Sequence, residues 1–329
     1  MISGKIRWGI LGTGYIAEKF AEALSFIPDA ELVAVGSRSK NTAEKFASKY
    51  KIPNPHGSYK GLIEDPEVDV VYVGTLNNVH KDNCIMAINA GKPILCEKPF
   101  MVNSKDAIEV ITLAREKKVF LMEALWTRFI PAFTEARKMW ESGVIGDVRM
   151  VSSDFGFLCE RSTTNPLFVS ELAGGAFMDV GPYSVSMAHI LFGEPDEITA
   201  LADMGPTGVD EQIGMLFKYK GGEIVLGYSS FNVESPKEAT ISGTKGYIRI
   251  HEPFFCPTGF TLHLNGQKPQ VFESPLEGNG WNYEAVEVME CLRAGKLECD
   301  LVPHEETLAL GRTMDRFRAH IGLKYKGIE

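Results

Sequence analysis

The feature that most constrains the fold is a glycine-rich turn between an apolar run and a helical pattern. Ile6–Leu11 predicts a buried strand, and the residues from 16 to about 26 have the spacing of a helix. Between them lies the G-x-G-x-x-A form of the dinucleotide fingerprint, in which Gly12 permits a tight turn, Gly14 lets the backbone approach a pyrophosphate, and Ala17 keeps helix and strand close. A purely structural turn is the alternative. The predicted cofactor contacts are Gly12, Thr13, Gly14, Tyr15 and Ile16.

Strand and helix continue to alternate as far as residue 123. The pattern predicts strands at 31–36, 68–73, 94–96 and 119–123, and helices at 41–50, 59–64 and 104–117, with a turn at 53–57. Such alternation is typical of α/β proteins. Residues 1–124 are therefore predicted to form an N-terminal Rossmann domain, a doubly wound parallel sheet.

The end of the second strand bears on which nucleotide is bound. Folds that prefer NAD usually carry an acidic residue there for the ribose 2′-hydroxyl, whereas this chain has Ser37 followed by Arg38. A guanidinium can grip a 2′-phosphate, and no carboxylate stands there to repel it. Ser37 and Arg38 therefore predict NADP rather than NAD. A solvent-exposed arginine in a loop is the alternative.

The loop Gly74–His80 follows the strand at 68–73 and opens a further helix. In open α/β sheets, ligands bind outside the carboxyl ends of the strands. We therefore expect Thr75, Asn77 and His80 to contact the cofactor. An Asn-rich helix cap explains the same loop without any ligand, and His80 then only occupies the first helical turn.

The next strand, at 94–96, ends in Glu97-Lys98-Pro99. Pro99 has no N–H with which to continue the strand ladder, and it biases Lys98 towards an extended conformation. The Lys98 ammonium is thus presented where the strand stops, beside the expected cofactor, and Glu97 is expected at the same site. A surface pair between Glu97 and Lys98 is the alternative.

The pattern changes in the second half of the chain. From about residue 148 most segments predict strands, at 148–157, 197–204, 212–219, 223–231, 238–242, 247–251 and 260–264, and helices at 282–294 and 303–321 close the chain. Several strands alternate apolar and polar residues, so one face of the sheet is solvated or forms an interface. Residues 125–329 are therefore predicted to form an α+β domain on a large, open, mostly antiparallel sheet.

One helix interrupts this strand-rich half. Pro182 suits a first helical turn, and Gly193 suits a C-terminal stop. The four-residue spacing of Asp179 and Tyr183 can place a carboxylate and a phenol on one side of a helix start, a pairing that can handle a hydroxyl proton. Asp179 as a simple cap and Tyr183 as a packed ring are the alternatives.

Composition excludes several classes of protein. The net charge of −9, without any Lys/Arg run, argues against a nucleic-acid partner. The six cysteines show no C-x-x-C and no paired His spacing, so neither a metal site nor a disulfide framework is predicted. No segment reads as a signal peptide or a membrane span, so no membrane partner is expected and the cytoplasm is the default compartment.

Over nearly its whole length the chain resembles the Gfo/Idh/MocA oxidoreductases. The strings that carry the resemblance are 12–17, 77–80, Glu97-Lys98-Pro99 and Asp179–Tyr183. Leu121–Phe129, Ser242–Gly246 and Cys256–Thr258 are most similar to the branch that holds dimeric dihydrodiol dehydrogenases and NADP-dependent D-xylose dehydrogenases. Many members carry His where this chain has Tyr183, and tyrosine is found in the dihydrodiol and sugar branches.

The resemblance implies hydride transfer between NADP and a secondary or anomeric carbinol of a sugar or cyclic diol, within a homodimer or a higher homo-oligomer. Lys98 and Tyr183 are expected to do the chemistry, with Asp179 orienting a substrate hydroxyl. A phenol with a pKa near 10 needs nearby cations to act as a base at neutral pH. Reduction of a ketone or keto-sugar, and nucleotide sensing without catalysis, are the alternatives. The candidate substrate contacts are Trp126, Arg128, Phe155 and Phe255, each of which could instead be a packing residue.

Overall fold

The computed structural model describes residues 4–328 and divides the chain into two compact units. The first unit takes in the chain up to Trp126 together with Glu277–Leu308, and the second takes in Thr127–Leu276 and the chain from Ala309 onward. The sequence placed residues 277–308 with the second domain. They join the first unit instead, because helix α9 (Trp281–Arg293) packs along α1 (Tyr15–Leu24).

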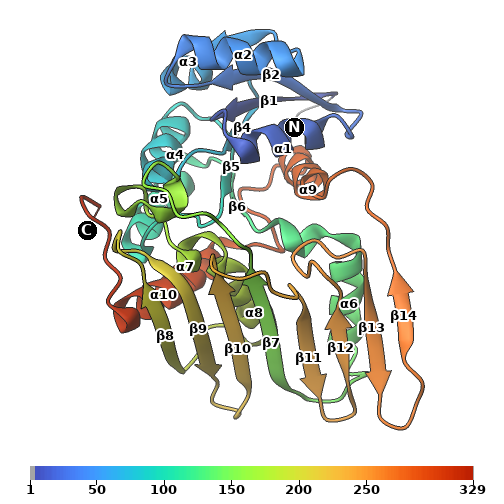
Figure 1. Cartoon of the computed structure of the whole chain (residues 1–329). Helices are drawn as coiled ribbons and strands as arrows, with labels where there is room; N and C mark the ends of the chain where they lie inside the picture. Colours follow the sequence, from blue (N-terminus) through green and yellow to red (C-terminus); the bar gives the residue numbers. More distant parts are fainter. Residues whose placement is uncertain (1–3, 329) are drawn as a thin grey trace. The chain divides into compact units, whose positions relative to one another are not determined.

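The first unit is built on a six-stranded, wholly parallel sheet, which confirms the predicted doubly wound fold (Figure 1). The strand order is β3-β2-β1-β4-β5-β6. The strands are β1 (Ile6–Leu11), β2 (Ala30–Gly36), β3 (Asn54–His56), β4 (Val70–Val73), β5 (Ile94–Glu97) and β6 (Leu121–Ala124). The helices that follow α1 are α2 (Lys40–Tyr50), α3 (Tyr59–Ile63), α4 (His80–Asn89) and α5 (Ser104–Lys117).

Both faces of this sheet are buried, as the continuous apolar runs predict. On one face, Phe20 of α1 stacks on Tyr72 with ring centroids 3.8 Å apart, and Trp8 meets Phe20 edge-on. On the other face, Val71, Val73 and Cys96 pack in one cluster with side chains of α4 and α5. Because neighbouring residues of a strand point to opposite faces, β4 contributes to both cores.

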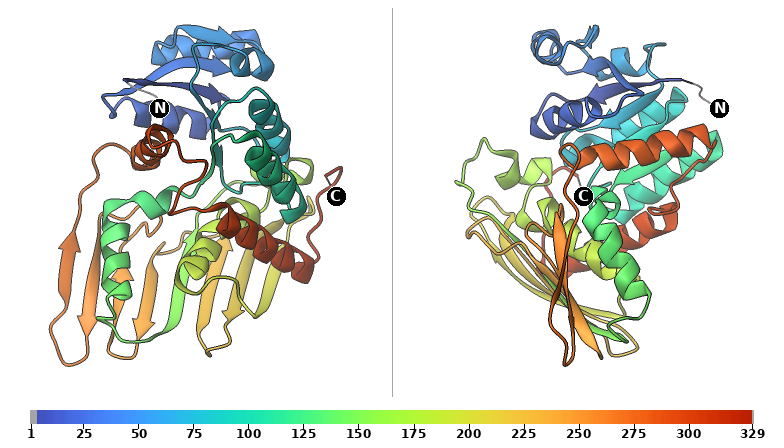
Figure 2. Two further views of the ribbon diagram at one scale, coloured as in Figure 1. Left: turned by 180° about the vertical axis from the view of Figure 1, so that it is seen from behind. Right: turned by 90° about the vertical axis from the view of Figure 1, so that its right-hand side faces the viewer.

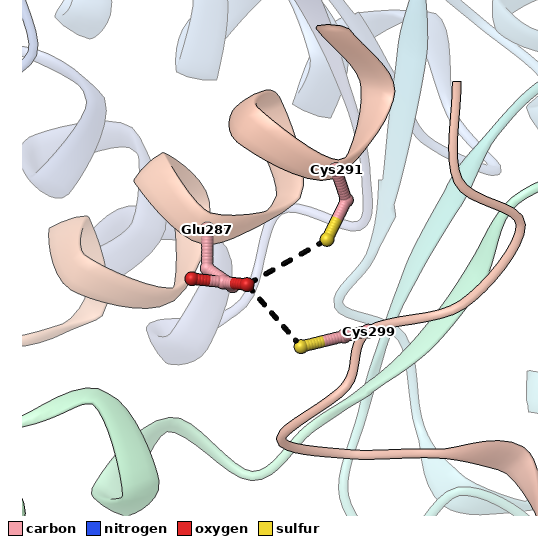
Figure 3. A group of neighbouring side chains, drawn as sticks. All are labelled: Glu287, Cys291 and Cys299. Atoms are coloured by element: carbon pink, nitrogen blue, oxygen red, sulfur yellow. Dashed lines mark hydrogen bonds between the residues drawn. The ribbon is translucent and has the colours of Figure 1, made fainter. Parts of the chain in front are cut away.

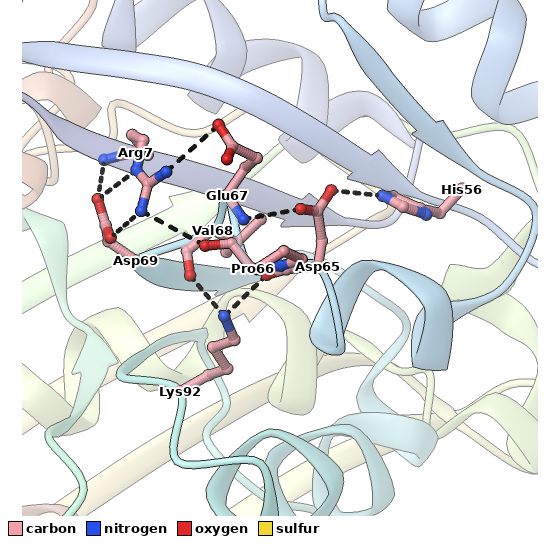
Figure 4. A network of polar contacts seen from close by, with 8 residues as sticks. All are labelled: Arg7, His56, Asp65, Pro66, Glu67, Val68, Asp69 and Lys92. Atoms are coloured by element: carbon pink, nitrogen blue, oxygen red, sulfur yellow. Dashed lines mark hydrogen bonds and ion pairs between the residues drawn. The ribbon is translucent and has the colours of Figure 1, made fainter.

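A polar network closes the amino ends of β1 and β4 (Figure 4). The guanidinium of Arg7 donates to both carboxylate oxygens of Asp69 at 2.8 and 3.0 Å, and Glu67 lies 3.3 Å from the same guanidinium. The ammonium of Lys92 donates to the carbonyls of Asp65 and Val68. These bonds hold the amino ends of the two strands in register. None of them involves the carboxyl ends of the strands, where ligands bind in open α/β sheets.

The second unit contains an eight-stranded, mostly antiparallel sheet, as predicted, in the order β14-β13-β12-β11-β7-β10-β9-β8. Only β7 and β10 pair in parallel within the described sheet. The strands are β7 (Val148–Gly156), β8 (Glu197–Met204), β9 (Asp210–Lys218), β10 (Ile224–Ser230), β11 (Ala239–Gly243), β12 (Gly246–Ile250), β13 (Gly259–Leu264) and β14 (Gln270–Glu273).

Helices cover one face of this sheet and leave the other bare (Figure 2). α6 (Pro131–Glu141) packs on β12 and β13, and α8 (Gly181–Phe192) packs on β7 and β10. Phe317 of α10 (His304–Ile321) meets Phe217 of β9. Burial therefore alternates from residue 211 to 218 of β9 and from residue 224 to 229 of β10, which explains the period-two pattern in the sequence.

Three short elements depart from the sequence prediction. β3 lies within the segment predicted as a turn, and β14 was not predicted; both are edge strands with little apolar signal. A four-residue helix, α7 (Ala176–Asp179), precedes α8 and is separated from it by Val180. No helix between residues 4 and 328 has both the length and the apolarity needed to span a bilayer.

Asp210, at the start of β9, caps α7 from a fully buried position. Its Oδ2 accepts a hydrogen bond from the Phe177 backbone N–H at 2.7 Å, and burial raises the pKa of this carboxyl to about 7. An unfolded chain would ionise Asp210 near pH 4, so between about pH 4 and 7 the folded state holds the extra proton. The stability contributed by the neutral acid is therefore lost progressively as the pH rises from about 4 to about 7.

Asp210→Asn should remove this pH dependence, because an amide does not ionise. We expect the free energy of unfolding of the parent to fall by roughly 2–3 kcal/mol more than that of the variant between pH 5 and 7. Urea denaturation of both proteins at the two pH values measures the difference. Asp203→Asn, on an exposed part of β8, is the matched control. Parallel pH profiles for parent and Asp210→Asn would contradict the assignment.

Candidate active site

One group of candidate site residues lies in the first unit, where β1 and β4 end side by side. The chain leaves these neighbouring strands towards opposite edges of the sheet, so this is its topological switch point. Gly12 has a φ of +111°, and a Cβ on it would collide with the carbonyl oxygen of Gly74. Only glycine at position 12 allows the two loops to approach this closely.

Gly14 leaves open space at the start of α1. A Cβ added there would meet no atom within 4 Å, and no side chain caps the helix at this N-cap position. The first backbone N–H groups of α1 therefore face an open, positively polarised position, the usual surrounding of a pyrophosphate. Thr13 and Ile16 are half-buried and Tyr15 is exposed, whereas Ala17 is fully buried against the sheet. These residues fit a dinucleotide.

Ser37 and Arg38 follow the carboxyl end of β2. Ser37 is buried, and its hydroxyl lies 2.6 Å from that of Thr42, so its side chain braces the start of α2. Arg38 is exposed. Of this pair, the structure leaves the guanidinium of Arg38 accessible for a phosphate.

His80 is fully buried at the start of α4 and joins two loops. Its Nε2 lies 3.1 Å from the carbonyl oxygen of Thr75, and its Nδ1 lies 3.0 Å from that of Pro99. Burial lowers the pKa of His80. The structure thus favours the first-turn alternative over direct cofactor contact, with His80 positioning the loops after β4 and β5. Asn77 opens a short 3-10 helix, Asn77–Val79, just before it.

Glu97 is the last residue of β5 and Lys98 follows it, and the structure gives the two side chains different surroundings. The Glu97 carboxylate is buried and accepts a 2.5 Å hydrogen bond from the Tyr72 hydroxyl and a 3.1 Å bond from the Lys98 backbone N–H. Glu97 therefore anchors the strand end. Lys98 is half-buried, and it is joined to Pro99 by a cis peptide bond.

A separate group of candidate site residues is an aromatic cluster within the second unit. Phe155 of β7 stacks on Phe255 with centroids 4.2 Å apart, and Tyr183 lies 5.4 Å from Phe155 and 5.1 Å from Phe255. All three rings are half-buried. The structure thus brings together two of the predicted substrate contacts and the predicted base.

Asp179 and Tyr183 do not share one helix, contrary to the simplest interpretation of their spacing. Asp179 ends α7, and Tyr183 lies in the first turn of α8, where its N–H donates to the Val180 carbonyl. Both side chains are half-buried. The break at Val180 comes from its backbone, which has a φ of −116° and a ψ of −13°.

The other two predicted substrate contacts are packed within their own units. Trp126 is 3% exposed and stacks on Trp281 of α9, both in the first unit, with centroids 4.1 Å apart. Arg128 is also 3% exposed, and its guanidinium donates to the Ser186 hydroxyl at 3.0 Å. Ser186 is one turn along α8 from Tyr183, so Arg128 braces the helix that carries the phenol.

Sequence reasoning missed three polar residues that support the site. Tyr72 holds Glu97, and Asn83 donates to the Thr75 hydroxyl at 3.1 Å. Glu284 of α9 is fully buried, and burial together with the nearby charge of Glu97 raises its pKa. The only indication of these residues in the sequence is that each is a polar side chain within an otherwise apolar strand or helix pattern.

Comparison with known proteins gives consistent results for both units. The family profile "Oxidoreductase family, NAD-binding Rossmann fold" matches residues 6–125, and the profile "GFO/IDH/MocA C-terminal domain" matches residues 133–249. The trans-1,2-dihydrobenzene-1,2-diol dehydrogenase of Mus musculus is 38% identical over 332 residues, which cover 97% of this chain and 98% of that protein.

The solved structures that are similar along nearly the whole chain include two oxidoreductases. The aldose-aldose oxidoreductase of Caulobacter crescentus, solved with glycerol, is 26% identical with a TM-score of 0.86, covering 96% of this chain and 97% of that one. The 3-ketoreductase KijD10 of Actinomadura kijaniata, solved with NADP and TDP-benzene, is 22% identical with a TM-score of 0.86, covering 96% and 98%. At 22% identity the likeness supports the fold alone.

Proposed function

Because the chain belongs to the Gfo/Idh/MocA family of NAD(P)-dependent oxidoreductases and acts on CH–OH groups, we propose that it is an NADP-dependent dehydrogenase of a sugar or cyclic diol. The observation that carries this proposal is the 38% identity, over nearly the whole length, to a dihydrodiol dehydrogenase. The 26% identity to an aldose-aldose oxidoreductase supports a sugar as the other substrate class. The substrate carbon would be a secondary or anomeric carbinol.

Residues of the first unit would hold the nucleotide. The α1 N-terminus with Gly12, Thr13 and Gly14 would bind the pyrophosphate, Arg38 the 2′-phosphate, and the Thr75–Asn77 loop the nicotinamide half. The bound nicotinamide supplies a hydride acceptor at C4. Glu97 and His80 would act indirectly, by fixing the loops that present Lys98 and Thr75.

The proton would be handled by this chain's own side chains. Tyr183 would accept the hydroxyl proton at its phenolic oxygen as the hydride leaves the carbinol carbon, and the Lys98 ammonium would favour the phenolate. Asp179 would accept a hydrogen bond from a second substrate hydroxyl. The stacked rings of Phe155 and Phe255 offer an apolar wall for a sugar face or a cyclic diol.

Absorbance of the reduced nicotinamide tests the proposal. The purified protein is mixed with NADP+ or NAD+ and a panel of aldoses, cyclic diols and inositols, and the same reactions are run backwards with NADPH and the matching ketones or lactones. Turnover of a carbinol with NADP+ supports a dehydrogenase, and turnover of ketones alone supports the reductase alternative. Nucleotide binding without turnover of any compound would favour the sensor.

The compartment is part of the same proposal. The six cysteines are free thiols in the described chain. Unpaired thiols are typical of proteins in a reducing compartment, and this supports a cytoplasmic location for the protein.

We also propose that the bare face of the second-unit sheet pairs with a second copy of the chain. Leu201, Leu216, Leu226 and Tyr228 project from β8, β9 and β10 on this face, and Leu201 is 87% exposed. A hollow of about 700 Å³ lies among the same strands. Contiguous apolar surface of this kind on the uncovered face of a sheet usually marks an interface.

Sedimentation equilibrium at micromolar concentration tests the pairing. We expect the parent to sediment as a dimer, and Leu201→Lys combined with Leu226→Lys to shift it to a monomer, because two ammonium groups would have to be desolvated in the interface. Ile108→Lys, on the exposed face of α5, is the control. A parent that sediments at 36.3 kDa would contradict the proposal.

A further inference from the structure

A cluster of two thiols and one carboxylate lies in the first unit and is not used by the proposed chemistry (Figure 3). Glu287 and Cys291 are one turn apart on α9, and Cys299 lies in the segment after the helix. The two Sγ atoms lie 3.6 Å and 3.5 Å from the same oxygen, Oε1 of Glu287. The three ligand atoms all lie within 4.8 Å of one another.

We propose that Glu287, Cys291 and Cys299 form a binding site for a single zinc ion, with water as the fourth ligand. Zinc binds sulfur at about 2.3 Å and carboxylate oxygen at about 2.0–2.2 Å in a tetrahedron, which places sulfur and oxygen about 3.5–3.7 Å apart. Both sulfur–oxygen distances here fall in that range. Both sulfur–oxygen separations are therefore already those of a tetrahedral zinc site.

The burial of the three side chains is consistent with a fourth coordination position of the zinc ion that is open to water. Cys299 is fully buried and Cys291 is 2% exposed, whereas Glu287 is only half-buried. The ion would reach the thiols from the Glu287 side, where a water molecule can complete the tetrahedron. The Leu301 backbone N–H already points at the Cys299 sulfur, 3.4 Å away, and such N–H contacts orient and stabilise a metal-bound thiolate.

The cluster lies at a structural junction of the first unit. The segment that follows α9 covers the edge strand β6: the Leu121 N–H donates to the Leu297 carbonyl at 3.1 Å, and Nε2 of His304 lies 2.9 Å from the Leu121 carbonyl oxygen. An ion held between α9 and Cys299 would tie this covering segment to the helix. Zinc should therefore raise the stability of the folded protein.

The sequence alone does not indicate this group of metal ligands. Its spacing is E-x3-C-x7-C, without C-x-x-C or a paired histidine, so the sequence predicted no metal site. The helix brings positions 287 and 291 together, and the turn at 299 supplies the second sulfur.

Cobalt and cadmium titrations of the chelator-treated, reduced full-length protein test the site. We expect one Co²⁺ per chain with the visible bands of tetrahedral coordination, one Cd²⁺ with thiolate charge-transfer absorption, and a higher melting temperature with Zn²⁺. Cys299→Ser should weaken Zn²⁺ binding at least about 100-fold, because loss of even an outer-shell partner costs 10–100-fold. Glu287→Gln, at a half-buried position that should not impair folding, should weaken it as well.

Cys256→Ser is the matched control, because it removes another thiol from the chain and leaves the cluster intact. Metal binding that is unchanged in both Cys299→Ser and Glu287→Gln would overturn the proposal. So would a parent that binds no Co²⁺ or Cd²⁺ and instead loses two thiols to a Cys291–Cys299 disulfide under mild oxidant, since the pair would then be a redox couple.

Discussion

Tyr183→Phe is expected to lower kcat for carbinol oxidation by roughly two to four orders of magnitude, the scale of lost general acid–base catalysis. The phenylalanine ring can keep the contacts with Phe155 and Phe255, so the aromatic cluster should persist. NADP+ affinity should change little, because the proposed nucleotide contacts all lie in the first unit. The measurements are kcat under saturating substrate and a separate NADP+ titration.

Lys98→Met should leave a weaker enzyme whose rate of oxidation rises only at higher pH, because the phenolate has lost a neighbouring cation. The double variant should be little worse than Tyr183→Phe alone, since both changes disable one proton-transfer unit. Tyr247→Phe removes a phenol elsewhere in the second unit and should behave like the parent. A Tyr183→Phe enzyme within a few fold of the parent would show that another group carries the proton.

Arg38→Asp should weaken NADP binding by roughly 10–100-fold, because a charge-assisted contact with the 2′-phosphate is replaced by repulsion. NAD binding should change only slightly, so the preference between the two nucleotides should fall or reverse. The measurement is the Kd of each nucleotide for parent and variant at one fixed ionic strength, since phosphate contacts weaken with salt.

Arg115→Asp is the control for Arg38→Asp. It makes the same change of charge on α5, where the parent arginine pairs with Glu305, and it should leave the ratio of the two Kd values unchanged. Equal losses of NADP and NAD affinity in Arg38→Asp would remove the basis for assigning NADP.

Local patterns were enough to predict most elements, including the strand, turn and helix that carry the glycine fingerprint. The helix at 104–117 and the strand at 197–204 have the predicted bounds. The strand-turn-helix at Gly12 and Gly14 follows the fingerprint closely, because glycine geometry and apolar periodicity act over a few residues. The bare, alternating sheet face was likewise visible in the pattern of side chains along each strand.

Contacts between residues far apart along the chain could not be predicted in this way. The hydrogen bond from Tyr72 to Glu97 makes Glu97 an anchor, and the two carbonyls around His80 make it a brace. The packing of α9 on α1 brings Glu277–Leu308 into the first unit. The pairing of Cys291 with Cys299 around Glu287 depends on how the segment after that helix returns to it. Periodicity reports which face of an element is buried, but only the packed chain shows which partner buries it.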